Sequence, residues 1–187
     1  METLLRIEEN ILMFIQENLR YDWLSVIFKS ITFLADKGWF WILLSLVMLV
    51  IRPTRRTGMI MCMSASLNIL LVNVTIKPLV ARTRPYILFE SLVSLVGRES
   101  DYSFPSGHSA ISFAVAMVLL LCLPKKFGIP AVVLAFLIAI SRLYVGVHYP
   151  TDVICGIIIG TACAFIAKFV FEKIEKKWSF IDKLKKL

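Results

Sequence analysis

The stretch from residue 148 to residue 171, HYPTDVICGIIIGTACAFIAKFVF, decides the fold class of this chain. After a polar corner that ends in Asp152, it continues without a charged residue as far as Lys168. A helix needs about 20 mostly apolar residues to cross the roughly 30 Å hydrocarbon core of a bilayer. Pro150 stands where a helix tolerates proline best, at its first position. The segment from about 151 to 171 is therefore predicted to span a membrane.

The composition of the whole chain is that of a membrane protein. Of its 187 residues, 58% are hydrophobic and only 18% are charged, and the mean hydropathy is +0.79. Soluble domains average about 45–50% apolar and about 25% charged residues, so a soluble fold is excluded. The net charge of +8 comes from basic residues between and after apolar stretches, where the positive-inside rule collects them. We therefore expect no nucleic-acid partner, and one membrane domain over residues 1–187.

The remaining apolar segments predict an all-α integral membrane protein with a six-span helical bundle. Residues 1–20 place apolar side chains at helical spacing, which predicts an amphipathic helix at the membrane interface. Residues 22–37 are apolar but short and contain Lys29. They fit either an imperfect first span or a re-entrant helix. The bundle as a whole covers residues 22–171, and its clearer spans are 38–51, 58–80, 108–123, 128–147 and 151–171.

The basic residues predict which end of this bundle faces the cytoplasm. Loops 52–57 and 124–127 contain five Lys and Arg, and the basic tail, residues 172–187, adds six lysines. These segments share one end if the spans alternate in direction, and the positive-inside rule assigns that end to the cytoplasm. Loop 81–106 and the corner at 148–151 then face outward from the cell membrane. Six crossings would place both termini inside.

The outward ends of the spans collect polar residues that a membrane disfavours. They are Lys77, Arg84, Ser106, Gly107, His108, Arg142, His148 and Asp152. Ionisable groups in or near spans are costly, so a functional role is the default hypothesis. Taken alone, a lysine is more often a snorkelling residue, an aspartate a helix cap, and an arginine such as Arg82 a lipid head-group contact. The convergence of the whole set at one end favours a catalytic site.

Five of these residues suit the binding of a phosphate group. Lys77, Arg84 and Arg142 are cations that can hold nonbridging oxygens, and arginine does so with bidentate geometry. Ser106 and Gly107 stand at a predicted helix N-terminus, where free backbone N–H groups attract an anion. Three cations can neutralise a phosphate, so the set requires no metal and no other cofactor.

The other three residues suit phosphoryl transfer. Asp152 follows His148 by four residues, roughly one helical turn. Its carboxylate can accept the proton on one imidazole nitrogen and leave the other nitrogen free to attack phosphorus. His108 is then available to protonate the leaving oxygen. The residues thus provide a nucleophile, a group that orients it and a general acid.

Three motifs, in this order, resemble those of the type 2 phosphatidic acid phosphatase superfamily. KPLVARTRP at 77–85 is similar to the KxxxxxxRP motif, PSGH at 105–108 to the second motif, and SRLYVGVHYPTD at 141–152 to SRxxxxxHxxxD. No motif position is altered. The resemblance covers about residues 38–171 and implies a six-span helical bundle with its site at the outer face.

The resemblance also implies the role of each residue. His148 is implied to form a phosphohistidine, oriented by Asp152, with His108 as the general acid for the leaving group. The phosphate-binding residues that it implies are Lys77, Arg84, Ser106, Gly107 and Arg142.

The main hypothesis is a metal-independent membrane phosphatase that acts on lipid phosphates or diphosphates. Bacterial members of the family similar in size act on undecaprenyl diphosphate, phosphatidylglycerophosphate or phosphatidic acid, and an outward site favours undecaprenyl diphosphate. The two phospholipids, and phosphoryl transfer to an acceptor other than water, stay open as alternatives. A transporter is disfavoured because residues 108–123 and 153–167 are almost wholly apolar beyond their outer ends. The sequence leaves the oligomeric state open.

Overall fold

The computed structural model describes residues 2–184 of the protein, with side chains over residues 3–178. Its helices are α1 (Glu2–Asn18), α2 (Asp22–Phe33), α3 (Trp39–Val50), α4 (Arg55–Asn68), α5 (Lys77–Val80), α6 (Pro85–Leu88), α7 (Gly107–Cys122), α8 (Lys125–Tyr144) and α9 (Pro150–Leu184). Shorter elements are the 3-10 turns η1 (Asp36–Gly38) and η2 (Arg52–Thr54) and the π-helix η3 (Ile69–Ile76). The described residues include no strand, so the predicted all-α class is confirmed.

The apolar helices form a bundle of the expected kind. Four helical stretches are long and apolar enough to cross a membrane, and α7 is a shorter apolar helix between them; the four are Asp22–Val50, Arg52–Leu88, Lys125–Tyr144 and Pro150–Trp178. The six predicted segments correspond to α2, α3, α4 with η3 and α5, α7, α8, and α9. The chain is therefore a multi-pass membrane protein.

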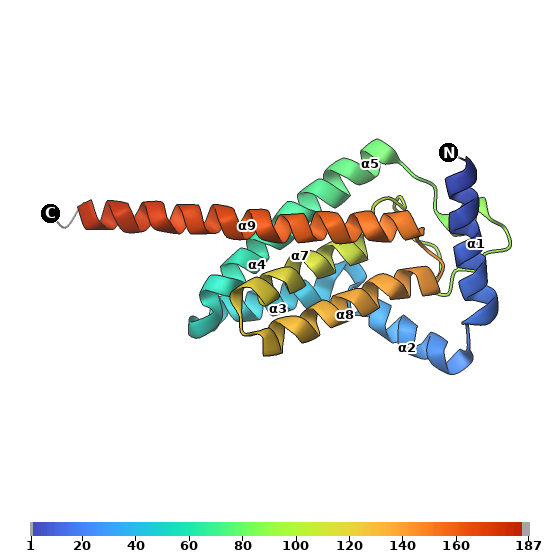
Figure 1. Ribbon diagram of the computed structural model, residues 1–187, viewed down its shortest axis with the longest axis horizontal. Coiled ribbons are helices and arrows are strands. Elements are labelled where there is room, and N and C mark those ends of the chain that lie inside the picture. Colours follow the sequence, from blue (N-terminus) through green and yellow to red (C-terminus); the bar gives the residue numbers. More distant parts are fainter. Residues whose placement is uncertain (1, 185–187) are drawn as a thin grey trace.

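The first two segments form one passage through the bundle. α2 and α3 have 12 residues each, so each is about 18 Å long, less than the roughly 30 Å of the hydrocarbon core. They follow one another in the same general direction (Figure 1). Between them Lys37 and Gly38 adopt positive φ angles, 49° and 73°, which break the helix. α1 consequently lies at the same end as loop 81–106, opposite to the far end of α9 (Figure 1). The two ends of the described chain lie at opposite ends of the bundle (Figure 1).

Helix α7 lies at the centre of the bundle. Ten of its 16 residues are buried, and it packs against α4, α8 and α9. Two glycines bring α9 close to it, since a Cβ at Gly160 would lie 2.2 Å from the carbonyl oxygen of Ala110, and one at Gly156 2.7 Å from that of Ser106. A side chain at either glycine would push the helices apart. The small residues of α9 therefore fix Asp152, in its first turn, relative to the start of α7.

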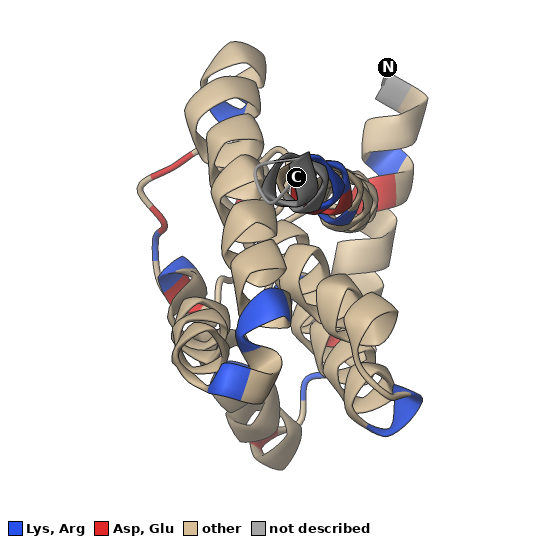
Figure 2. Ribbon diagram, turned by 90° about the vertical axis from the view of Figure 1, so that its left-hand side faces the viewer, with Lys and Arg blue, Asp and Glu red and all other residues tan. Residues whose placement is uncertain are grey.

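Basic residues gather at the end of the bundle away from loop 81–106, which faces the viewer in Figure 2. Arginines begin α4 and lysines begin α8 at this end. α9 continues beyond the predicted boundary at 171 as far as Leu184, and Arg56 of α4 forms an ion pair with Glu175 at 2.9 Å. The first part of the predicted tail therefore extends the last span, and residues 185–187 lie outside the described residues.

Candidate active site

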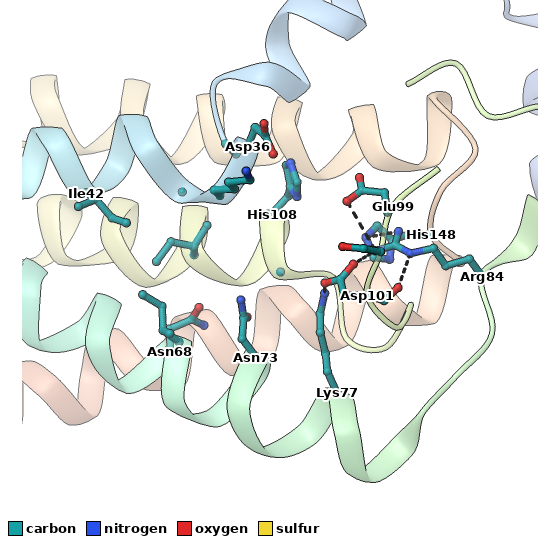
Figure 3. Close-up of a pocket in the computed structure, with 17 residues that line it drawn as sticks. Asp36, Ile42, Asn68, Asn73, Lys77, Arg84, Glu99, Asp101, His108 and His148 are labelled. Carbon is teal, nitrogen blue, oxygen red and sulfur yellow. Dashed lines mark hydrogen bonds and ion pairs between the residues drawn. The ribbon is translucent and has the colours of Figure 1, made fainter. Parts of the chain in front are cut away.

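Loop 81–106 and the neighbouring helix ends enclose a cavity of about 410 Å³ (Figure 3). One end is polar and is lined by Lys77, Arg84, Gly107, His108 and His148. The other end lies between α3 and the helix of α4 and η3, and it is lined by apolar residues that include Ile42, Ile69 and Ile111. A second cavity of about 390 Å³, lined by Arg142, shares His108 with the first. Six of the eight residues expected from the motifs thus line these two neighbouring cavities, and the other two, Ser106 and Asp152, are completely buried.

The π-helix η3 determines which way Lys77 faces. In a continuous α-helix the nine positions from Asn68 to Lys77 make about two and a half turns, so the two side chains would point in opposite directions. A π-helix bonds each N–H to the carbonyl five residues earlier, so residues four or five apart stack on one face. Asn68, Asn73 and Lys77 accordingly line the same cavity. Lys77 is only 5% exposed, and its ammonium group is held at the polar end.

The N-terminus of α7 forms another part of the polar end. Ser106 is the N-cap, and its buried hydroxyl accepts a hydrogen bond from the Ser109 backbone N–H at 3.4 Å. Gly107 follows as the first helical residue. A Cβ there would lie 3.7 Å from Lys77 Nζ, so the absence of a side chain keeps the space beside the lysine open. Free N–H groups, the helix dipole and a cation therefore face one space, which suits an anion.

His148 lies in the corner between α8 and α9 and is 1% exposed. Its Nδ1 lies 3.4 Å from Asp152 Oδ2, and its Nε2 lies 3.5 Å from Arg84 Nη1 at the cavity. Burial, and then the positive charges of Arg142, Arg84 and Lys77, hold the pKa of His148 well below its ordinary value. A neutral imidazole with a carboxylate behind it is the form that attack on phosphorus requires.

Asp152 is completely buried. The groups that hold it come from residues outside the motifs or at the variable positions within them. Ser103 Oγ donates a hydrogen bond to its Oδ2 at 2.5 Å, and the Tyr149 backbone N–H donates to the same oxygen at 3.0 Å. Arg82 Nη1 donates to Oδ1 at 2.6 Å. Arg82 also donates to Glu8 of α1 at 2.5 Å, and Glu8 is only 2% exposed. Helix α1 therefore contributes a buried carboxylate to the network behind the histidine.

The sequence carries little sign of this network. A periodic pattern identifies the faces of the first helix but not what one of its polar residues will contact. Arg82 and Glu8 are separated by 74 positions, and an arginine at the end of a span is as well suited to a lipid head group. The single hint is that Glu8 and Arg82 are ionisable groups beside apolar segments.

Each cation of the predicted phosphate site is paired with a carboxylate from loop 81–106. Asp101 accepts hydrogen bonds from Lys77 and from Arg84, and Glu99 accepts one from Arg142 (Figure 3 shows the first two cations). Burial alone would raise the pKa of Asp101, but the hydrogen bonds and charges of Lys77 and Arg84 outweigh it and lower that pKa. Two carboxylates thus occupy the cradle in which phosphate oxygens are expected, and the sequence did not indicate either of them.

Comparisons with known proteins agree with this geometry. The sequence matches the PAP2 superfamily over residues 57–176, a range that contains all three motifs. It is 33% identical over 151 residues to an undecaprenyl-diphosphatase from Sulfolobus acidocaldarius, covering 80% of this chain and 73% of the relative. It is 34% identical over 170 residues to phosphatidylglycerophosphatase B from Bacillus subtilis, covering 84% and 80% of the two chains.

A solved structure extends the likeness to the fold. The crystal structure of a transmembrane PAP2-type phosphatidylglycerolphosphate phosphatase from Bacillus subtilis matches with a TM-score of 0.77 at 30% identity. The match covers 93% of this chain and 89% of that chain. It therefore includes nearly the whole bundle.

Proposed function

Because this chain belongs to the PAP2 superfamily and is a membrane lipid phosphatase like its named relatives, we propose that it removes the terminal phosphate of undecaprenyl diphosphate. The observation that carries this proposal is the shape of the cavity, which joins a cationic end beside His148 to an apolar end between α3 and η3. A lipid phosphate has the same two parts. Phosphatidylglycerophosphate is the alternative, because a relative of similar identity bears that name.

The proposed reaction proceeds in two steps through His148. Its Nε2 attacks the terminal phosphorus, the bond from phosphorus to the bridging oxygen breaks, and His108 gives its proton to the leaving lipid monophosphate. Water then attacks the phosphohistidine, His108 accepts a proton from that water, and inorganic phosphate leaves as Nε2 is restored. Asp152 holds the Nδ1 proton throughout. The phosphate oxygens are bound by Lys77, Arg84 and Arg142, with the helix N-terminus at Ser106 and Gly107.

A diphosphate is the favoured substrate for a chemical reason. Its leaving group is a phosphate, which is more stable as an anion than the alkoxide that a phosphate monoester must release. In the stretch from 87 to 101, the carboxylates of Glu99 and Asp101 are paired with the phosphate-binding cations, which leaves fewer polar side chains to select a glycerol or sugar head group. We therefore expect broad activity on lipid phosphates with a preference for diphosphates.

A competition assay tests this function. Purified enzyme in mixed micelles, in the presence of excess EDTA, receives undecaprenyl diphosphate and phosphatidylglycerophosphate, and kcat/KM is measured from phosphate release. We expect the diphosphate to be preferred and EDTA to have no effect, because three cations supply the charge neutralisation. A preference of about tenfold for the glycerophosphate, or about 1.4 kcal/mol of transition-state stabilisation, would favour the alternative. Phosphate release that depends on an added acceptor would indicate a phosphotransferase.

We further propose that the site faces outward across the cell membrane, with the basic tail, residues 172–187, on the cytoplasmic side of this single membrane domain. The support is that Lys and Arg gather at the end of the bundle away from the cavity (Figure 2), and the positive-inside rule assigns such an end to the cytoplasm. In an active background without the native cysteines, Glu90→Cys should react with a membrane-impermeant thiol reagent in intact cells, and Thr54→Cys should react only after permeabilisation. Both changes leave the number of Lys and Arg unchanged. The reverse labelling would invert the orientation.

A further inference from the structure

The cavity continues past the catalytic residues along one wall of amides. Asn73 lines it between Asn68 and Lys77, which precede and follow it along the same wall (Figure 3). Its Oδ1, like Lys77 Nζ, lies 3.7 Å from the place of a Cβ on Gly107, so the amide borders the phosphate cradle directly. Asn68 lies farther along this wall, but it is only 1% exposed and its Nδ2 is enclosed by protein. Asn73 is exposed, so it is the amide that this wall presents to a ligand.

The opposite wall provides a further cation. Lys37 of η1 lines the same cavity as Asn73 and has a φ angle of 49°. A left-handed backbone at a residue other than glycine is strained, and such strain clusters at functional sites. Asp36 lines this part as well, and its negative charge opposes an anion, so the lysine charge is needed there. Beyond the motif residues, this part of the cavity therefore presents Lys37 and the Asn73 amide, with Asp36 beside them.

We propose that Lys37 and Asn73 form a subsite for the second phosphate of a lipid diphosphate, the one that stays on the lipid after hydrolysis. This subsite rests on the proposed function. With the terminal phosphorus beside His148, the leaving oxygen faces His108, and the second phosphate lies beyond it. Lys37 and the amide N–H groups then stabilise the charge that develops on the leaving phosphate.

The apolar end of the cavity takes the remainder of such a substrate. Ile42, Ile69 and Ile111 line the space beyond the two amides, between α3 and η3. The chain attached to the second phosphate continues along these side chains toward the lipid. Along the cavity, His148 and His108 are followed by Lys37 and then by the apolar wall. This order matches a lipid diphosphate, in which the terminal phosphate is followed by the second phosphate and then by the apolar chain.

The test compares two substrates with one tail, farnesyl diphosphate and farnesyl monophosphate, by kcat/KM for phosphate release in detergent. Lys37→Asn removes the charge while keeping a residue that tolerates positive φ, and Asn73→Ala removes the adjoining amide. Each is expected to lower kcat/KM for the diphosphate about tenfold or more and to change the monophosphate value less than twofold. Lys37→Arg should restore the preference. Lys125→Asn, which changes an exposed lysine that begins α8 at the opposite end of the bundle, is the matched control and should change neither value.

The possible failures are separable. Equal losses on both substrates in Lys37→Asn and Asn73→Ala, or no loss on either, overturn the subsite and leave the phosphatase function standing. A wild-type enzyme that releases phosphate from neither substrate overturns the proposed function and the subsite with it. A diphosphate preference that disappears only in the two subsite variants supports both.

Discussion

Replacing His148 with alanine is expected to abolish the phosphoenzyme and to lower turnover by at least about 10³-fold, as for other covalent nucleophiles. The Nε2 at the cavity is the only histidine nitrogen that the structure supports from behind with a carboxylate, within the part of the chain that it describes. The phosphoenzyme is measured by mass spectrometry after brief exposure to a lipid diphosphate and an alkaline quench, because phosphohistidine is labile in acid.

His108→Ala is the matched variant for this experiment. His108 lines the cavity but belongs to the start of α7, and its proposed role is to protonate the leaving oxygen. It should therefore still allow slow phosphorylation of His148 by 4-nitrophenyl phosphate, whose leaving group needs no proton. Phosphate trapped on any other residue, or a labelled His148→Ala enzyme, would contradict the assignment.

Arg82→Ala is expected to have the second largest effect, on both stability and activity. It leaves Glu8 and Asp152, which are 2% and 0% exposed, as buried carboxylates without their shared cation. Removing one partner from a buried ion pair costs about 3–5 kcal/mol. Because Asp152 also orients His148, kcat/KM should fall about 100-fold or more in the protein that remains folded. Thermal unfolding in detergent and lipid diphosphate hydrolysis measure the two effects.

Two further variants separate charge pairing from packing. Glu8→Gln keeps a side chain that can accept from Arg82 and leaves Arg82 paired with Asp152, so it should be milder than Arg82→Ala. Arg6→Ala removes an exposed arginine of α1 and should be close to neutral. An Arg82→Ala protein as stable and as active as Arg6→Ala would contradict the role of the network.

Much of the fold could be predicted because long apolar stretches indicate which helices lie in the membrane. The span that starts at Pro150 and the cap at Ser106 follow from local chemistry, an apolar run in one case and a side chain that accepts a backbone N–H in the other. Hydropathy does not record direction, so it could not show that α2 and α3 form one passage. The break depends on the backbone conformation of Lys37 and Gly38, which no apolar pattern reports.

The site was predictable only as far as its residues lie in short motifs. His148 and Asp152 are four residues apart in one motif, so their proximity was predictable, although His148 lies in the corner before α9 and the contact is made by that corner. The contact of Arg82 with Glu8 and those of Glu99 and Asp101 with the cations depend on how α1 and an irregular loop fold back onto the bundle. A loop has no periodicity from which to read a face, and a single sequence does not record which distant residues meet.

The carboxylates of Glu99 and Asp101 have a consequence for selectivity, because they form a competitor that is part of the enzyme. A tethered group has a fixed effective concentration that dilution does not change. Every incoming anion must displace it, and the apparent affinity falls by the fraction of molecules whose cradle is open. A cradle open in about one molecule in a hundred would weaken the binding of all anions about 100-fold. A lipid substrate is confined to the same membrane as the site and reaches a high local concentration, whereas released inorganic phosphate is diluted into the surrounding solution. Because both affinities fall by the same factor, the substrate at its high local concentration could still fill the site, whereas inhibition by free phosphate would require a correspondingly higher phosphate concentration.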